Sequence, residues 1–289
     1  MKEKIETRRF YRNDSRLEVE VVAIEKLKRI GRVVLSKPHR TDFHHVFLVE
    51  NACTHYVDFK KIKIQPYSLL FIAKGKVHAF DPSIKLQGRI IIFTEHVFSV
   101  SESDVSFLKN TPLFDSLYEI FTIPLSKVLF AKFSTICEDI REESDSNAMR
   151  SEPVLVKNLL QNFLIIAERT LRDQGFREKR KDADWDEVVR FRELLENRFT
   201  EHKTVFEYAD EMGIGLKKLE RLTMRILGKS PKAIVHERLL LEAKRLLAYT
   251  NRSVKEIAHH LGFDDPSYFV RYFKRFANIT PLEFRETFK

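Results

Sequence analysis

Two stretches in the C-terminal part of the chain carry basic side chains at the spacing of one helix face. Side chains three and four residues apart lie on the same side of an α-helix. Arg and Lys on such a face can hold DNA phosphates or donate to base edges, whereas a merely solvated basic surface is the plainer alternative. The residues concerned are, in chain order, Lys217, Lys218, Glu220, Arg221 and Arg225, then Ser267, Arg271, Lys274 and Arg275.

These stretches belong to an internal repeat. The segment VFEYADEMGI (205–214) aligns with VKEIAHHLGF (254–263). The second copy has one extra residue in its turn, so equivalent residues beyond the turn are one position farther apart in the sequence. Each copy has an alanine, which is small enough for a second helix to pack closely across the first. Four residues later comes a glycine, which can end a helix in the left-handed conformation. The pattern predicts two helix-turn-helix units.

The elements around the repeat are all predicted to be helical. Thr204 and Ser253 stand where N-caps belong, and each is followed three residues later by a glutamate, Glu207 or Glu256, which is the pattern of a capping box. Apolar periodicity between these signals sets the approximate helix bounds. The expected helices are 185–199, 204–212, 215–227, 231–249, 254–261, 266–276 and 281–287.

A single such unit could equally be a plain helical hairpin with a charged outer face. Here two copies are joined by the long helical segment PKAIVHERLLLEAKRLLAYT (231–250). Two reading helices on one rigid connector can lie in successive major grooves on one face of a duplex. The repeat therefore favours double-stranded DNA as the partner.

The region from Trp185 to Lys289 resembles the DNA-binding domain of AraC/XylS-type transcription regulators, on the residues LGKSPKAIVHERLLLEAKRLL and SVKEIAHHLGFDDPSYFVRYFKRFANITPLEFR. The resemblance implies a bi-partite helix-turn-helix domain, an asymmetric DNA half-site and control of transcription, with activation as the commoner mode. It also implies a homodimer and RNA polymerase as a partner. By the resemblance, base-facing residues would be Lys217, Glu220, Arg221, Ser267 and Arg271, and phosphate contacts would be Lys218, Arg225, Lys274 and Arg275.

The first copy departs from the family pattern. Gly215 stands where a Ser or Thr usually caps the reading helix, and Thr223 replaces a usual core aromatic. Glu220 at a base-facing position could accept a hydrogen bond from cytosine N4, or could simply repel phosphate. The first copy is therefore expected to be less tightly packed than the second, or to prefer a different DNA sequence.

The N-terminal half has a different pattern of apolar residues. From Leu17 to Phe93, short runs rich in Val, Ile and Phe are broken by Pro and Gly, which predicts a sandwich or barrel. Residues 39–80 are similar to the core of the cupin-like sensor barrel that the family often carries. Residues 95–109 predict a short helix, and 113–124 a strand or irregular segment. Amphipathic helices are expected at 126–143 and 152–174, and the resemblance makes them a dimerisation element.

Five of the ten histidines fall between His39 and His78. A metal site is one interpretation, but the His-x-His half of the metal-cupin pattern is absent, and the adjacent His44 and His45 would point to opposite faces of a strand. Hydrogen-bonded barrel histidines are the plain alternative. We favour contacts to a small-molecule effector for His39, His45 and His78, with no metal and no cofactor.

Composition limits the remaining classes. The 289 residues are 43% hydrophobic and 32% charged, with a formal net charge of +9 divided between both halves. No apolar run approaches a membrane span, no signal peptide is evident, and the two cysteines fit a reducing cytoplasm. Phosphate-binding glycine loops, nucleophile elbows and redox cysteine pairs are not evident, so we expect no enzyme.

The sequence thus predicts an α+β multidomain protein: a cupin-like β-barrel plus helices, then an all-α, bi-partite helix-turn-helix domain. The expected domains are an effector-sensing barrel (1–110), a helical dimerisation element (111–176), a linker (177–184) and the DNA-binding domain (185–289). The predicted function is sequence-specific regulation of transcription, most plausibly activation, in response to a small molecule. One alternative is a metal-dependent cupin enzyme with a DNA-tethering domain. Another is a protein-interaction module whose C-terminal half binds a protein partner and not DNA.

Overall fold

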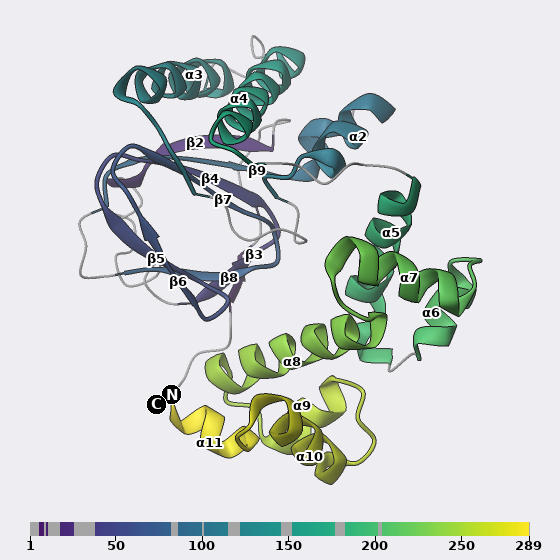
Figure 1. Ribbon diagram of the computed structural model, residues 1–289. Helices are drawn as coiled ribbons and strands as arrows, with labels where there is room; N and C mark the ends of the chain where they lie inside the picture. The colour runs from purple at the N-terminus through teal and green to yellow at the C-terminus, as the bar shows by residue number, and fades with distance from the viewer. Residues whose placement is uncertain are drawn as a thin grey trace. The chain divides into compact units, whose positions relative to one another are not determined.

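The chain divides into two compact units, Glu6–Glu178 and Lys179–Lys289, here called the N-terminal and C-terminal units (Figure 1). The computed structural model describes residues 6–8, 10, 18–25, 38–81, 86–99, 101–114, 122–145, 152–176, 183–201 and 204–288. Residues 26–37 of the strand-rich region expected from Leu17 to Phe93, and most of the expected linker, lie outside these residues. The N-terminal unit is built on β-sheets and the C-terminal unit is entirely helical in its described part, which confirms the predicted fold class.

Two five-stranded sheets form the barrel of the N-terminal unit. The first sheet has the order β1-β3-β8-β5-β6, with β1 (Glu6–Arg8), β3 (His39–Thr41), β8 (Val77–Phe80), β5 (Cys53–Val57) and β6 (Lys60–Ile64). The second has the order β10-β7-β4-β9-β2, with β10 (Thr122–Pro124), β7 (Ser68–Ile72), β4 (His44–Val49), β9 (Gly88–Phe93) and β2 (Val19–Ala23). All pairings are antiparallel except that of β1 with β3.

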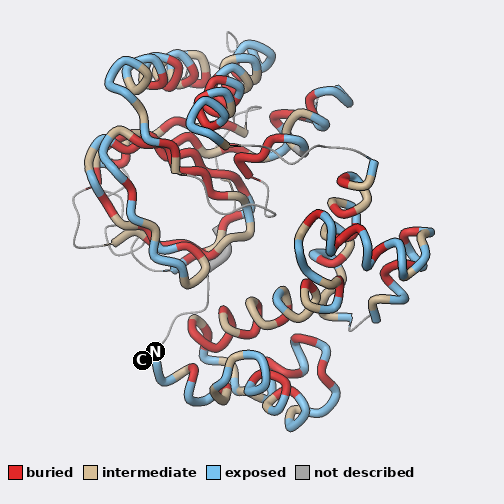
Figure 2. Tube along the Cα trace, in the orientation of Figure 1, coloured by how far each residue is buried: buried red, intermediate tan, exposed pale blue. Residues whose placement is uncertain are grey.

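The second sheet is buried on both faces, and Figure 2 shows its central strands buried along their length. Along β4, Phe47 and Val49 pack into the barrel, while Val46 and Leu48 pack against a separate core shared with helices. Successive side chains of a strand point to opposite faces, so a strand covered on both sides must be apolar throughout. This explains why HVFLV reads as a continuous hydrophobic run.

Helices α3 (Lys127–Asp145) and α4 (Pro153–Asp173) cover the outer face of the second sheet (Figure 1). Their predicted positions are confirmed within two residues at either end. The single helix expected at 95–109 is instead two, η1 (Glu95–Phe98) and α2 (Glu102–Asn110). The interruption has a local cause, because the Ser101 hydroxyl accepts from the Asp104 backbone N–H and starts a new helix.

The C-terminal unit contains the seven expected helices, together with the short 3-10 helix η2 (Phe199–Glu201). Their bounds are α5 (Ala183–Arg198), α6 (Val205–Glu211), α7 (Leu216–Leu227), α8 (Pro231–Tyr249), α9 (Val254–His260), α10 (Pro266–Ala277) and α11 (Pro281–Glu286). Because α5 begins at Ala183, the last two residues of the linker expected at 177–184 are helical. The long helix α8 connects the pair α6–α7 to the pair α9–α10 (Figure 1).

Ionic contacts tie α8 to its neighbours. The Arg238 guanidinium donates to both carboxylate oxygens of Glu196 on α5, at 2.6 and 2.8 Å, and to Glu242 one turn further along α8. Glu242 is only 5% exposed and also accepts from the buried Arg245. Burying charges is unfavourable unless they are paired, so this network fixes the register of α5 on α8.

Candidate nucleic-acid interface

The two sequence repeats have the same backbone construction. Both predicted capping boxes are present: Thr204 and Ser253 each accept from the backbone N–H three residues on, while Glu207 and Glu256 each accept from the cap's own N–H. A third box, which sequence reasoning missed although its T-x-x-E pattern is present, caps α11 through Thr280. Each box satisfies N–H groups that a helix start otherwise leaves without partners.

The turns of the two copies also match. Gly213 has φ +68° and Gly262 has φ +84°, which confirms the left-handed conformation expected at both positions. Directly after them, the Ile214 and Phe263 N–H groups each donate to the carbonyl five residues back, at 3.0 Å. This six-residue hydrogen bond ends the first helix and directs the chain sharply into the second.

Helices α7 and α10, here called the reading helices, end in the same way. Gly228 and Asn278 both adopt the left-handed conformation, with φ +68° and +64°, and donate to the carbonyls of Met224 and Lys274 respectively. The two reading helices therefore correspond position by position at an offset of 50. Each helix buries one face, with Leu219 in α7 and Phe269 in α10 both 0% exposed.

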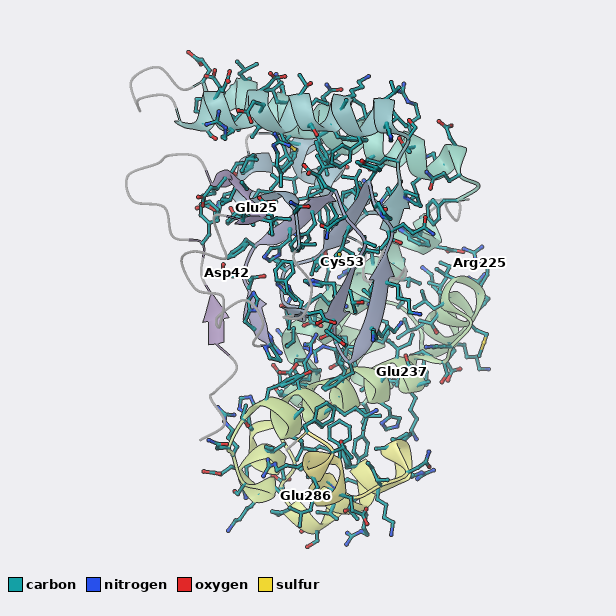
Figure 3. All side chains as sticks on the ribbon, turned by 90° about the vertical axis from the view of Figure 1, so that its left-hand side faces the viewer. Glu25, Asp42, Cys53, Arg225, Glu237 and Glu286 are labelled. Atoms are coloured by element: carbon teal, nitrogen blue, oxygen red, sulfur yellow. The ribbon has the colours of Figure 1, made fainter. Side chains whose placement is uncertain are left out.

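All nine residues predicted to contact DNA lie on the exposed sides of the reading helices. The structure thus brings the predicted set onto two helix faces, one in each copy. Figure 3 shows Arg225 at the surface of α7. Three exposed side chains on these helices were not predicted: Met224, seven residues after Lys217, Tyr268, next to Ser267, and Phe276, next to Arg275. Helical spacing would have found Met224.

The first reading helix is partly neutralised by α5. Lys218 Nζ lies 3.3 Å from Glu187 Oε1, and Arg225 forms an ion pair with Asp184. Within the described part of the chain, Lys217 and Arg221 show no such ion pair. The cations of α7 therefore divide into two that face α5 and two that face solvent.

The second reading helix has a side-chain cap that the first lacks. The Asp265 Oδ1 atom accepts from the Ser267 N–H at 2.8 Å, whereas Gly215 at the start of α7 offers no side chain, as the sequence indicated. That hydrogen bond, from the Ser267 backbone, is the first cause of the lowered pKa of Asp265, so the carboxylate stays ionised. A negative charge at a helix N-terminus is also favoured by the helix dipole.

In the N-terminal unit, the three histidines predicted to contact an effector lie together between the sheets. The His78 ring centroid is 4.4 Å from that of His39 and 4.6 Å from that of His45. His55 joins them, with Nε2 3.1 Å from His78 Nδ1. Sequence reasoning missed His55, although it alternates with the buried Cys53 and Val57 along β5.

This histidine cluster, His39, His45, His55 and His78, is buried. Each ring is at most 3% exposed. Burial, together with the nearby His39, lowers the pKa of His55 from 6.5 to about 3. His55 is therefore neutral at pH 7, and a neutral imidazole keeps one donor and one acceptor nitrogen, so this ring can hydrogen-bond a polar group without holding charge.

His44 points to the other side of β4, as the alternation predicted. It packs on Phe93 and Phe114, and its Nε2 lies 3.6 Å from Glu95. Glu95 is also paired with Lys74 at 2.6 Å, and the neighbouring His44 imidazole is the first cause that lowers the pKa of Glu95 to about 2. His44 therefore lies beside the surface ion pair of Glu95 with Lys74 and not in the histidine cluster.

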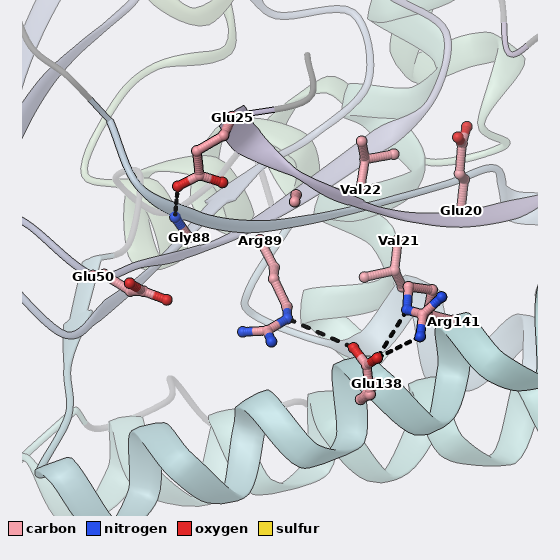
Figure 4. A pocket seen from close by; sticks show the side chains of 10 residues that line it. Glu20, Val21, Val22, Glu25, Glu50, Gly88, Arg89, Glu138 and Arg141 are labelled. Atoms are coloured by element: carbon pink, nitrogen blue, oxygen red, sulfur yellow. Dashed lines mark hydrogen bonds and ion pairs between the residues drawn. The ribbon is translucent and has the colours of Figure 1, made fainter. Parts of the chain in front are cut away.

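A polar pocket of about 570 Å³ lies elsewhere in the N-terminal unit, between β2, β9 and α3 (Figure 4). Its lining includes Glu25, which accepts from the Gly88 N–H, and Arg89, which pairs with Glu138. Arg141, one turn further along α3, also pairs with Glu138. The Arg89–Glu138 pair links the sheet to α3, and none of the clustered histidines lines this pocket.

Other reactive groups are few. In the described ranges, no set of three or more His, Cys, Asp or Glu side chains has an arrangement suited to a metal ion. Both cysteines are buried thiols, and burial raises the pKa of Cys137 to about 12. None of the helices that the structure describes combines the length and apolar character needed to cross a membrane.

Comparison with known proteins gives consistent results. A family described as "Helix-turn-helix domain" matches residues 208–287. The chain is 23% identical over 252 residues to the HTH-type transcriptional activator RhaS of Enterobacter sp., covering 86% of this chain and 87% of the relative. It is 25% identical over 277 residues to the thermoregulatory protein LcrF of Yersinia pestis, covering 93% and 97%.

Solved structures include an AraC-type DNA-binding domain protein from Chromobacterium violaceum, with 29% identity, a TM-score of 0.33, and coverage of 35% of this chain and 90% of that one. Another is fatty-acid-bound ToxT from Vibrio cholerae, with 13% identity, a TM-score of 0.46, and coverage of 95% and 97%. The sequence matches and the duplicated helix-turn-helix geometry lead to one assignment. The C-terminal unit contains an AraC-family helix-turn-helix domain, and the chain is similar over most of its length to transcriptional activators such as RhaS.

Proposed function

We propose that this protein is a sequence-specific transcription activator whose N-terminal barrel responds to a small molecule. One observation carries the proposal: two helix-turn-helix copies with the same caps and turns present two exposed, cation-bearing helices on one connecting helix. Helices spaced on a rigid connector can enter successive major grooves. Activation rests on the names of relatives such as RhaS, which is described as a transcriptional activator.

The test is selection of duplexes from a random library by the purified full-length chain at moderate salt. Wild-type protein should enrich a sequence with two short conserved blocks, one for each reading helix. Arg221→Ala should weaken the base preference in one conserved block, and Arg271→Ala should weaken it in the other, because each substitution removes a donor that can reach base edges. Enrichment of no sequence would contradict the proposal, and equal weakening for all duplexes would make these arginines phosphate contacts only.

For the effector, we propose that the histidine cluster holds a polar group of the small molecule inside the barrel. The support is the convergence of four buried imidazole rings from both sheets, next to Phe47 and Phe80. A ligand changes DNA binding only if it prefers one arrangement of the protein over another. Loss of the effector response in His45→Phe and His78→Phe, with basal DNA binding kept, is the expected result.

The proposal includes a homodimer formed through α3 and α4. Val128 on α3 is 81% exposed, and Val154 and Ile165 on α4 are 53% and 49% exposed, although these helices bury their other faces on the second sheet. Exposed apolar side chains on such a surface favour a second copy as partner. Sedimentation of the wild type against Ile165→Glu checks this, and an unchanged dimer in the variant would place the interface elsewhere.

A further inference from the structure

Arg271, the arginine near the middle of the second reading helix, is contacted from two sides. Its Nη2 atom lies 3.6 Å from Asp265 Oδ2, and its guanidinium carbon lies 5.9 Å from the centre of the Tyr268 ring. Asp265 is the residue that caps α10 through its other oxygen. One carboxylate therefore fixes both the start of the helix and the direction of the arginine.

Tyr268 is anchored in turn. Its ring lies 5.9 Å from the ring of Phe263, the buried residue that follows the turn glycine. Phe263 also packs on Phe269 and Tyr272, both at 5.2 Å between ring centres. Although Tyr268 is 54% exposed, its ring is therefore connected to the core of the copy. A ring supported in this way is a defined surface for a guanidinium.

The first copy lacks both supports. At the position of Asp265 it has Gly215, which has no side chain, and at the position of Tyr268 it has Lys218, which pairs with α5. Arg221, which corresponds to Arg271, shows no ion pair with any residue that the structure describes. The chain thus contains an internal comparison: Arg271 is contacted by two neighbouring side chains at its base-facing position, and Arg221 lacks both contacts.

We propose that Asp265 and Tyr268 are positioning residues that orient Arg271 to read a guanine. This rests on the proposed function. A guanidinium held in one orientation loses less freedom when it donates to guanine O6 and N7 together, which is the commonest specific arginine contact. The Asp265 carboxylate also repels phosphate, so it weakens binding to unrelated DNA. Both effects raise the preference for the correct sequence, and the second reading helix is the more discriminating of the two.

The experiment uses the full-length chain and the duplex it enriches from a random library. All four bases are placed at the position whose guanine preference is lost in Arg271→Ala, and each affinity is measured by competition. Asp265→Asn keeps an oxygen for the Ser267 N–H but removes the charge. Tyr268→Leu removes the ring. Phe206→Leu is the matched control, because it removes an exposed ring from the first copy outside its reading helix.

Asp265→Asn and Tyr268→Leu should each lower the guanine preference about 2- to 5-fold, the size expected for an exposed ion pair or cation–π contact. Asp265→Asn should at the same time bind random DNA more tightly, which a merely structural role would not produce. Phe206→Leu should leave this preference unchanged. Unfolding curves, followed by Trp185 fluorescence, show whether each variant is folded, and Asp265→Ser is a second variant that keeps a capping oxygen.

Three results would overturn the inference. An unchanged guanine preference in both variants would show that Arg271 needs no support. A guanine preference that survives in Arg271→Ala would assign that base to another residue while leaving the proposed function intact. Enrichment of no sequence at all by the wild type would remove the proposed function and the inference together.

Discussion

Lys218 on the first reading helix forms an ion pair with Glu187 on α5, with Nζ 3.3 Å from Oε1. Arg225, two turns along the same helix, pairs in the same way with Asp184. Two cations expected to hold phosphates are thus occupied by carboxylates of the helix that begins the C-terminal unit. DNA must compete with α5 for them, because a cation paired to a carboxylate is less available to a phosphate.

Glu187→Gln should therefore strengthen DNA binding. With its carboxylate removed, Lys218 can contact a phosphate, and each added phosphate contact steepens the slope of log K against log salt by about 0.9. Fluorescence anisotropy of a labelled duplex at several salt concentrations measures both quantities. Asp186→Asn is the matched control, since it removes the same charge from an exposed position of the same helix. Equal changes in both variants would mean a general charge effect and no release of Lys218.

Ser253→Ala should destabilise the C-terminal unit by about 1 kcal/mol, the usual cost of losing a side-chain N-cap. The Ser253 hydroxyl accepts from the Glu256 N–H at 3.2 Å at the start of α9. Trp185 is the only tryptophan and is 3% exposed within this unit, so its fluorescence in urea follows the unfolding of the unit itself. Ser253→Asp, which keeps a capping oxygen, should restore most of the loss. A Ser253→Ala midpoint equal to that of the wild type would show that the cap adds no stability.

Glu242→Ala should cost considerably more, roughly 3 kcal/mol, because breaking a buried ion pair leaves its partner in a poorly solvating environment. Glu242 is 5% exposed and Arg245 is 3% exposed, with Nη1 to Oε2 at 3.1 Å. Glu237→Ala is the matched control on the same helix, because Glu237 pairs with Lys229 at the surface and should contribute under about 1 kcal/mol. The free energies of unfolding from urea titration decide between them, and equal losses would argue against a special role of the buried network.

The N-terminal unit should lose stability in acid. The pKa of His55 is about 3 in the folded protein. Burial is the main cause of this lowering, so the pKa returns to near 6.5 once the chain unfolds. Burial also lowers the pKa of His44. A depressed histidine pKa means that the unfolded state takes up protons first, so stability is complete above pH 6.5 and falls below it. The loss is at most about 1.4 kcal/mol per pH unit for each such histidine.

Thermal unfolding at pH 7.5 and at pH 5.0 checks this, with circular dichroism at a wavelength that follows the sheets. His55→Phe removes the buried titrating ring and should flatten the pH dependence. His96→Gln is the control at an exposed histidine. The same pH dependence in His55→Phe as in the wild type would place the acid sensitivity in other groups.

The C-terminal unit could be predicted from the sequence almost to the residue. Its helices begin at visible caps such as Thr204 and Ser253, and its turns end at glycines that need positive φ. Such signals act within a few residues, so they are readable without the rest of the fold. The third box at Thr280 had the same signal.

The sheet-based unit was harder to predict because its strands depend on distant partners. β6, with the charged sequence KKIKI, does not look like a core strand, yet it pairs with β5 along its whole length. His55 was missed for a related reason: only the pairing of β5 with β8 brings it to His78. The ion pairs of α7 with α5 likewise join residues whose spacing in the chain carries no signal.

The pairing of β2 with β9 has a consequence for the order of events during synthesis. Val19 pairs with Phe93, and β9 is the one neighbour of β2 in its sheet. On the ribosome, β2 therefore emerges long before its partner exists and must wait with an apolar face and an open hydrogen-bonding edge. The helix pairs α6–α7 and α9–α10, whose contacts are local, form as soon as they emerge. We therefore expect chaperones to assist the folding of the first ninety or so residues more than the folding of the C-terminal unit.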